Sequence, residues 1–383
     1  MVPKIYDEFQ MQSPQQGGYS YKYRGTLTHC RKCEVTEVRN GTYTLSLETT
    51  VNDECADLIL SQRMIGVKPN PTDNMQFFEI QKTERTLDGI IKAEAKHIKC
   101  LCFAICTDGG SSTPEDPFIF RGTAQQTWNE LVNNNISSAV PFSFTSDIGT
   151  IADFKLGLTI SETLGNILGG KEGSFLDVYG GEYKWDNFNI YLYASRGVNR
   201  HYKIKYGQNI SDASQTESCE NVYSHILPYA WISTPSSAKV SVSAPLVAIP
   251  NNSSTYQKVY GLDCTELLDP YIYGPSQVPG TITLQQAQAM MTAYALQYAS
   301  VNSLGNLDIN IDVTLRAELD EMSQIGLCDT VKVILDPFGT SATAKITSVT
   351  YDALLERWNK IVIGSPKITV ADLILDKRRF IST

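Results

Sequence analysis

Apolar and polar residues alternate along several short stretches of this chain, which is the pattern of strands that bury one face. The first two stretches, 34–38 and 43–47, flank Asn40-Gly41, a pair typical of the type I′ turn of a β-hairpin. Further strand-like runs follow at 76–80 and 89–95. We therefore expect the chain to begin with a small β-barrel or β-sandwich.

A stretch rich in Gly, Ser and Pro at 107–117 has no apolar face, so it predicts an exposed linker and a domain boundary. Two short helices are expected beyond it, at 124–131 and 161–168, because apolar residues recur there at helical spacing. Alternation then returns at 188–193 and 201–206, and we expect these two runs to pair as a second hairpin.

The strongest helix signal lies at 284–301, where Thr283 and Gln286 have the spacing of a capping box. The residues whose three-to-four spacing predicts its buried side are Ala287, Met291, Tyr294 and Tyr298. Alternation over 307–315 and strand-like runs at 331–335 and 344–349 then predict a closing β unit.

The composition is typical of an ordered, strand-rich protein: 383 residues, 42% hydrophobic and 19% charged, with 20 Tyr and 13 Phe. This length predicts two to four packed units. The formal net charge is -9 and no run rich in Lys or Arg occurs, which disfavours avid binding to nucleic acid. Apolar stretches are shorter than the ~18–20 residues that span a bilayer, and residues 1–8 carry no signal-peptide core, so we expect no membrane insertion and folding in a cytoplasm.

Candidate metal sites in the sequence are weak. The nine cysteines are odd in number, which with no export signal predicts buried free thiols and no disulfide framework. The sharpest alternative is a zinc ion with four ligands from two sets, Cys30 and Cys33 preceded by His29, and Cys100 and Cys102 followed by Cys106, although the spacing of the second set is unusual. A calcium loop at 308–312 is disfavoured because Val313 replaces the glycine that the turn needs.

Candidate catalytic groups are equally sparse. The chain has no His-Glu-x-x-His and no Gly-x-Ser-x-Gly motif. The four histidines, at 29, 97, 201 and 225, are scattered, and we expect His97 and His201 to pack within strands. We therefore expect no catalytic residues, no bound metal and no cofactor.

Several short motifs, in this order, resemble the N-terminal hub region of phage minor tail structural proteins, the prophage tail endopeptidase family. The resemblance covers most of the chain. The motifs that carry it are 33–37 with 40–41 and Tyr43, 95–98, 142–148, 180–188, 196–197, 206–209, and 327–333 with 351–361 and Gly364. The residues that match the family's motifs, and to which we assign a structural role, are Asn40, Gly41, Tyr43, His97, Gly181, Glu182, Asp186, Asn187, Tyr206, Gly207, Asn209, Asp329, Thr330, Arg357 and Gly364. Cys328 departs from the glycine usual in the family, which puts the backbone of that turn in question.

The resemblance implies a mainly β fold with a few helices (α+β), like the baseplate hub proteins of long-tailed phages. Two small β-barrel tube domains and two peripheral domains are implied. The expected division is a first barrel at 1–110, a peripheral α+β domain at 117–200, a second barrel at 201–240 and 305–366, a peripheral β domain at 241–304 with the helix 284–301, and a tail at 367–383.

The function implied is that of a structural hub at a virion tail tip, assembled in the host cytoplasm and not itself an enzyme. A homotrimer would supply six barrels to a hexameric tail tube. Its implied partners are the distal tail protein and tail tube above, and the tape-measure protein and a fibre or lysin below, while DNA passes without specific binding.

Two questions stay open at this point. The alternating residues Asp308, Asn310 and Asp312 either line the channel, where acidity lets DNA pass, or form a solvated outer face. A cell-wall hydrolase or endopeptidase is the rival function, and a receptor-binding module that holds saccharide on exposed aromatic residues is a third.

Overall fold

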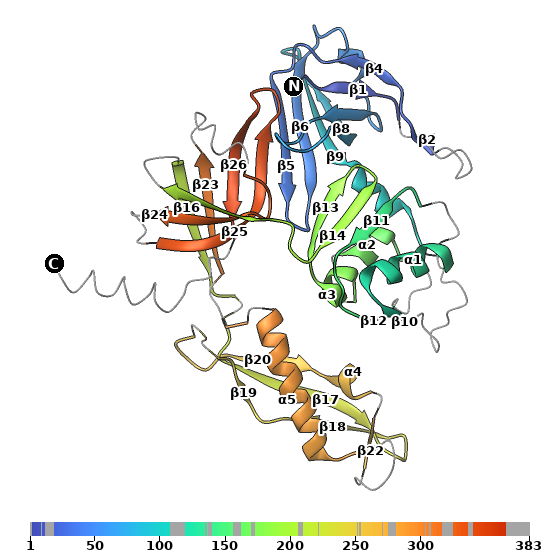
Figure 1. Ribbon diagram of the computed structural model, residues 1–383, viewed down its shortest axis with the longest axis vertical. Coiled ribbons are helices and arrows are strands. Elements are labelled where there is room, and N and C mark those ends of the chain that lie inside the picture. The colour runs from blue at the N-terminus through green and yellow to red at the C-terminus, as the bar shows by residue number, and fades with distance from the viewer. Residues whose placement is uncertain are drawn as a thin grey trace, which may run out of the picture. The chain divides into compact units, whose positions relative to one another are not determined.

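A computed structural model shows the fold of the chain (Figure 1). It describes residues 2–8, 10–11, 19–107, 119–134, 136, 140–155, 162–169, 173–205, 210–220, 222–250, 252, 254–269, 271–274, 281–302, 304–305, 308–315, 325–335 and 340–364. The chain forms two compact units: the first comprises residues 1–214 and 311–383, and the second comprises 215–310.

The first unit begins with antiparallel strands. Their bounds are β1 Lys4–Tyr6, β4 Tyr23–Thr26, β5 Lys32–Val38, β6 Tyr43–Thr50, β7 Met64–Val67, β8 Gln76–Arg85 and β9 Ile90–His97, with the short pair β2 Gln10–Met11 and β3 Tyr19–Ser20, and a 3-10 turn at Ala56–Leu58. Burial alternates residue by residue along β5 and β6, as the sequence pattern predicts. These strands therefore bury one face.

The β5–β6 hairpin is confirmed, but its predicted turn type is wrong. Asn40 has a φ of 54°, whereas Gly41 lies outside the left-handed region, and a type I′ turn needs positive φ at both central residues. The N–H of Gly41 instead donates to the carbonyl of Val38 at 3.0 Å. The asparagine, not the glycine, takes the unusual backbone conformation here.

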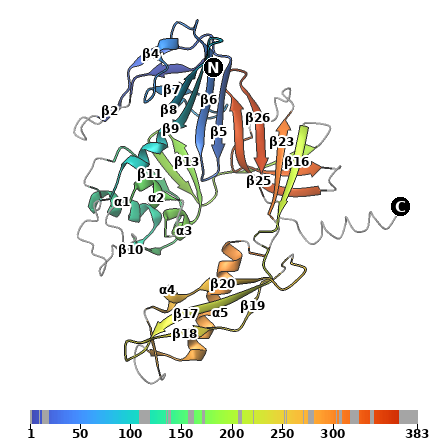
Figure 2. The same cartoon turned by 180° about the vertical axis from the view of Figure 1, so that it is seen from behind.

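The last strands of the chain continue the first sheet. Their bounds are β15 Asn199–Lys205, β16 Ile210–Ser218, β23 Asp308–Leu315, β24 Thr330–Leu335, β25 Thr340–Asp352 and β26 Arg357–Ile363. Strand β25 pairs antiparallel with β5 from Ser348↔Val38 to Asp352↔Glu34, so segments about 310 residues apart lie side by side (Figure 1 and Figure 2). One 13-stranded sheet thereby runs through both β regions.

An α/β segment lies between these β regions in the sequence. Its elements are the 3-10 helix η3 Ile98–Ala104, β10 Ile119–Gly122, α1 Ala124–Asn134, β11 Ser143–Ser146, β12 Ala152–Lys155, α2 Leu164–Leu168, α3 Phe175–Tyr179, β13 Glu182–Asp186 and β14 Asn189–Tyr193. Trp128, Phe144 and Phe175 belong to the same hydrophobic core as Tyr6 and Phe77 of the first strands. The α/β segment thus shares its core with the first β region.

The predicted hairpin between 188–193 and 201–206 is wrong. Strand β14 pairs with β13 on one side and with β11 on the other, while β15 pairs parallel with β24. The tight turn is at Asn187, with a φ of 50°, and this turn joins β13 to β14. The loop after β14 is held by bonds to distant segments, which are described below.

The second unit is a six-stranded sheet with one long helix on one face. Its elements are β17 His225–Ser233, β18 Lys239–Ser243, β19 Val247–Ala248, β20 Val259–Asp263, α4 Thr265–Leu268, β21 Ile272–Tyr273, β22 Thr281–Ile282 and α5 Leu284–Val301. The expected domain boundary was residue 240, whereas the compact unit begins at residue 215. The reason is that β17 is the central strand of this sheet and buries Ile226, Ala230 and Ile232 in the same core as α5.

Helix α5 has the predicted bounds and the predicted capping box between Thr283 and Gln286. Its buried side is formed by Ala287, Met291, Ala295 and Ala299. Tyr294, predicted on that side, is 36% exposed. Within the described ranges, the helices all fall short of the length and apolar character that a membrane crossing requires.

Candidate functional site at the junction of three segments

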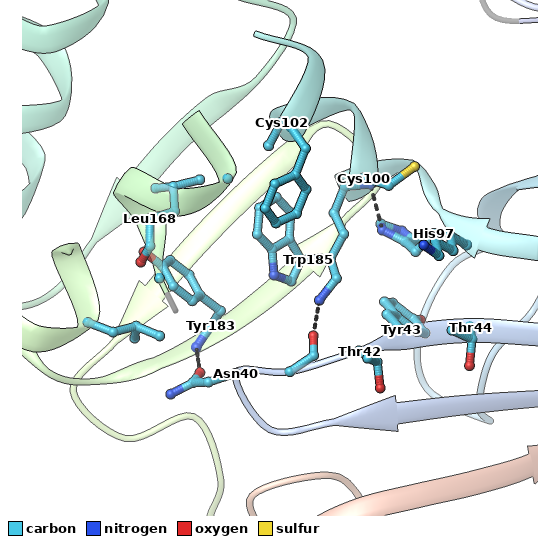
Figure 3. Close-up of a pocket in the computed structure, with 17 residues that line it drawn as sticks. Asn40, Thr42, Tyr43, Thr44, His97, Cys100, Cys102, Leu168, Tyr183 and Trp185 are labelled. Carbon is cyan, nitrogen blue, oxygen red and sulfur yellow. Dashed lines mark hydrogen bonds between the residues drawn. The ribbon is translucent and has the colours of Figure 1, made fainter. Parts of the chain in front are cut away.

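The tip of the β5–β6 hairpin is bonded to β13 through a side chain. The Asn40 amide nitrogen donates to the carbonyl of Gly181 at 2.9 Å. Its amide oxygen accepts from the N–H of Tyr183 at 2.8 Å, a bond that Figure 3 shows. Gly181 has a φ of 95°, and a Cβ there would lie 2.7 Å from the carbonyl oxygen of Tyr193. The asparagine side chain thus pairs with β13 as the backbone of a neighbouring strand would.

The turn between β13 and β14 is bonded to the start of β8 in the same manner. The Asn187 side chain accepts from the N–H of Phe77 and donates to the carbonyl of Met75, both at 2.9 Å. Gln76, which is 1% exposed, donates to Asp186 Oδ1 at 2.8 Å and accepts from the N–H of Asn187 at 2.7 Å. Two amide side chains therefore fix this turn onto the first β region.

His97 belongs to this packing. Its Nδ1 accepts from the N–H of Lys99, so its Nε2 carries the proton and donates to Gln76 Oε1 at 3.1 Å. The ring stacks on Tyr43 at 4.4 Å between centroids. Complete burial, reinforced by the charge of Lys99, holds the pKa of His97 well below its ordinary value. The imidazole is neutral and part of the core.

A buried ion pair joins β5 to the loop after β14. Arg196 binds Glu37 through both guanidinium nitrogens, at 2.6 and 3.3 Å, and the two side chains are 10% and 8% exposed. Burial by itself would lower the pKa of Arg196, but the charge of Glu37 and the hydrogen bonds to it outweigh burial and raise that pKa. Arg196 also donates to the carbonyl of Tyr183 at 3.0 Å. One guanidinium thus connects β5, β13 and the loop.

Glu182 of β13 is the second centre of charge. It accepts from Lys345 of β25 at 2.7 Å and from the backbone N–H of Arg196 at 2.8 Å, with Arg39 at 3.6 Å. Burial alone would raise the pKa of Glu182, but the Lys345 and Arg196 hydrogen bonds and the nearby cations outweigh it, so the pKa lies below its ordinary value. Glu182 is therefore charged and bound to the last β region.

Asp329 connects the same loop to the last β region. Its carboxylate accepts from the N–H of Val198 at 2.9 Å and from Nε of Arg200 at 3.1 Å. A Cβ at Gly197 would lie 1.8 Å from the carbonyl oxygen of Cys328, so only glycine permits this approach. Cys328 has a φ of 70°, which shows that the turn keeps a glycine-like backbone although the residue is cysteine.

Nine of the motif residues thus meet at one junction. They are Asn40, Gly41, Tyr43, His97, Gly181, Glu182, Asp186, Asn187 and Asp329. They join three segments: the β5–β6 region, the α/β segment and the last β region. We call this set of contacts the three-segment junction.

The remaining motif residues lie elsewhere. Thr330 donates from its N–H to the carbonyl of Val198 at 3.0 Å, next to the junction. Arg357 begins β26, and the N–H of Gly364 donates to the carbonyl of Lys345 at 2.9 Å. The motif residues outside the described ranges are Tyr206, Gly207 and Asn209.

The proposed channel residues Asp308, Asn310 and Asp312 all belong to β23, in agreement with their alternation. Strand β23 pairs with β26, with Asp312 opposite Val362. The side chains of these three residues lie outside the described part of the structure. Their orientation stays a prediction.

A cavity of about 380 Å³ lies beside the junction, between the hairpin tip and the α/β segment. Tyr183 and Trp185 line it from β13, and the Tyr183 ring points toward Leu168, to whose carbonyl its hydroxyl donates at 2.8 Å (Figure 3). Lys99 donates to the carbonyl of Gly41 and lies 5.6 Å from the centre of the Trp185 ring. Burial lowers the pKa of Lys99 to about 8. Among the described residues that line the cavity, there is no carboxylate to pair with this lysine.

The described histidine side chains lie in separate contacts. His29 Nδ1 lies 3.9 Å from Asp53 Oδ2 and 3.2 Å from Thr28 Oγ1. His225 Nδ1 lies 2.9 Å from Ser224 Oγ, but that hydroxyl bridges to both the N–H and the carbonyl of Lys258. The side chain of His201 is outside the described residues. In those ranges, which include the cysteines of the alternative zinc site, no three His, Cys, Asp or Glu side chains group as a metal site.

Solved structures of tail proteins share this fold. A prophage tail protein gp18 from Listeria monocytogenes EGD-e matches at 12% identity with a TM-score of 0.57, over 100% of both chains. The 43 kDa tail protein of prophage MuSo2 from Shewanella oneidensis matches at 12% identity and 0.57, over 95% of this chain and 98% of that one.

This chain has the fold of prophage tail proteins. A tail protein from Neisseria meningitidis MC58 agrees, at 9% identity and a TM-score of 0.56 over 95% of this chain and 97% of that one. No protein-family model and no curated protein matches the chain. The mainly β, α+β fold class implied by the sequence resemblance is confirmed.

Sequence reasoning missed three residues of the junction in this tail-protein fold. Glu37 could have been found from the sequence, because it alternates with the polar positions of β5 and so faces inward with Cys33 and Val35. A charge at an inward-facing position needs a partner. Gln76 and Lys345 carried none, since their partners lie 110 and 163 residues away.

Proposed function

We propose that this chain is the structural hub of a tail tip, in a bacteriophage, a prophage or a tail-like particle. It assembles as a homotrimeric ring that continues and closes the hexameric tail tube. The observation that carries the proposal is the likeness to prophage tail proteins over essentially the whole length of both chains.

The three-segment junction supports a mechanical role. A ring subunit transmits load between neighbours, so its β regions must not shift against one another. Strand pairing of β25 with β5 joins the two regions along one sheet, and the buried Glu37–Arg196 pair and the Glu182–Lys345 bond hold the α/β segment to both. Charge-assisted bonds of this kind fix geometry in addition to adding stability.

The proposed partners follow from this position. The distal tail protein and the tail tube lie above the ring, and the tape-measure protein and a fibre or lysin lie below. Asp308 and Asp312 face the channel, where negative charge lets DNA pass without adhering. A net charge of -9 supports this arrangement.

Native mass spectrometry tests the assembly. The purified chain, alone and co-expressed with the tube and distal tail proteins of the same phage genome, is expected to give a species of three times 42.5 kDa in at least the second sample. A chain that stays monomeric in both samples contradicts the hub.

Incubation with purified cell walls tests the absence of enzymatic activity. The chain is expected to release no peptide or reducing sugar, with lysozyme as the positive control. Release of peptide or reducing sugar by this chain alone would favour the hydrolase. That release should persist in each single junction variant and disappear when the chain is denatured.

A further inference from the structure

The six-stranded sheet of the second unit has one face packed on α5 and a second face that carries large apolar side chains. On the central strand β17 these are Leu227, Tyr229 and Trp231, which are 38%, 39% and 50% exposed. They alternate with residues that pack into the α5 core. Neighbouring exposed aromatic side chains in a row are typical of a binding surface, unlike single exposed apolar residues.

Polar groups flank this row on both sides. On β18, Ser241 lies opposite Trp231 and Ser243 lies opposite Tyr229. On β20, the exposed Asp263 is in register with Tyr229. The Asp263 Oδ1 atom accepts from the N–H and the hydroxyl of Thr265 at 2.9 and 2.5 Å, which fixes the carboxylate in place.

The neighbour of Leu227 on β20 is Gly261, which leaves space on the sheet. A Cβ at Gly261 would lie 3.7 Å from Cε1 of Tyr229, so the phenol ring leans across the glycine. Residues two apart on a strand are separated by about 6.7 Å. Tyr229 and Trp231 are therefore successive exposed aromatic residues on the same face of β17.

We propose that this surface binds a neutral oligosaccharide of N-acetylated hexosamine units. We call it the β17 face, and it comprises Leu227, Tyr229, Trp231, Ser241, Ser243 and Asp263. The electron-rich face of an indole or phenol attracts the C–H groups of a sugar ring, while hydroxyl groups at the rim of the sugar donate to a carboxylate and to serine hydroxyls. Leu227 offers an apolar contact for the methyl of an acetamido group.

The Asp263 carboxylate distinguishes a sugar from a protein partner that brings no cation. An apolar protein surface laid on the β17 face would bury the Asp263 carboxylate without a cation, which is costly. A sugar instead donates two hydroxyls to it and needs no counter-charge. The proposal is independent of the oligomeric state and of the hub function.

Isothermal titration calorimetry of the full chain with chitohexaose, a linear hexamer of N-acetylglucosamine, tests this proposal. The wild-type chain is expected to bind, and Trp231→Ala to bind about tenfold more weakly, since one aromatic stacking contact is lost. Asp263→Asn is expected to weaken binding as well. Tyr256→Ala is the matched control, because Tyr256 belongs to the same unit and is 70% exposed but lies in the loop before β20 and is not part of the β17 face. It is expected to bind as the wild type does.

Tyr229→Ala gives a second variant should Trp231→Ala fail to fold. The proposal is overturned if the wild-type chain does not bind at saturating chitohexaose. It is also overturned if Trp231→Ala and Tyr229→Ala both bind as tightly as the wild type. Sedimentation velocity of the same samples identifies the rival occupant: a change in oligomeric state in Trp231→Ala, with no sugar binding by the wild type, assigns the face to a protein interface.

Discussion

Breaking the buried pair of Glu37 and Arg196 is expected to cost far more than breaking an exposed ion pair. Removing one partner of a buried pair typically costs 3–5 kcal/mol, because the other charge stays buried without compensation. Glu37→Gln keeps the shape of the side chain and removes its charge, so we expect a loss of about 3 kcal/mol in the free energy of unfolding of the first unit. Arg196→Met is expected to cost at least as much, since the carbonyl of Tyr183 also loses its donor.

A double-mutant cycle separates the pair from other effects. Once both charges are gone, neither is left uncompensated, so the double variant is expected to lose less than the sum of the two single variants by at least about 1.5 kcal/mol. Urea unfolding followed by tryptophan fluorescence reports on the first unit, which holds Trp128, Trp185 and Trp358 of the four tryptophans.

The matched control is the exposed pair of Arg121 and Asp153. Its atoms are 3.4 Å apart and its side chains are 73% and 53% exposed. Asp153→Asn is expected to cost under about 1 kcal/mol. Strict additivity in the Glu37–Arg196 cycle, or a single-variant loss as small as that of the control, would refute the reasoning that this pair holds β5 to the α/β segment.

Three further predictions concern backbone strain, acid stability and thiols. Cys328→Gly should be more stable than Cys328→Ala by about 1 kcal/mol in thermal unfolding, because glycine, unlike alanine, adopts a φ of 70° without strain; equal stability would argue against a left-handed turn. The lowered pKa of Glu182 gives stability that is present above its unfolded pKa and is lost as pH falls through the lower folded value. Lys345→Met should therefore raise the pH of acid unfolding, and an unchanged pH midpoint would contradict the Glu182–Lys345 bond. Ellman's reagent should react rapidly with the exposed thiols Cys106 and Cys219 only, and rapid reaction of further thiols would contradict the described burial.

Elements with local signals could be predicted from the sequence. The capping box and spacing of α5 and the alternation of β5 and β6 depend on neighbouring residues, and both predictions are confirmed. The prediction at 188–206 was wrong because the same alternation also suits a strand that pairs elsewhere. The sequence pattern does not indicate that β14 pairs with β11 or that β15 pairs with β24.

The junction could be predicted only in part. The resemblance singled out Asn40, Gly181 and Glu182, but it did not indicate that these residues meet in the fold. Their contacts depend on β25 pairing with β5 across about 310 residues and on side chains that replace backbone pairing. Such long-range registers are set by the packed core as a whole, so no single sequence pattern specifies them.

Cryo-electron microscopy of an assembled tail tests the central claim most directly. The chain is located by a tag fused to its N-terminus, in tails made by the phage or prophage that encodes it. The hub account predicts three copies in a ring at the end of the tail tube, coaxial with it, with β23 beside the channel. Density for this chain away from the tube axis, or a tube that closes in the absence of the chain, would contradict it.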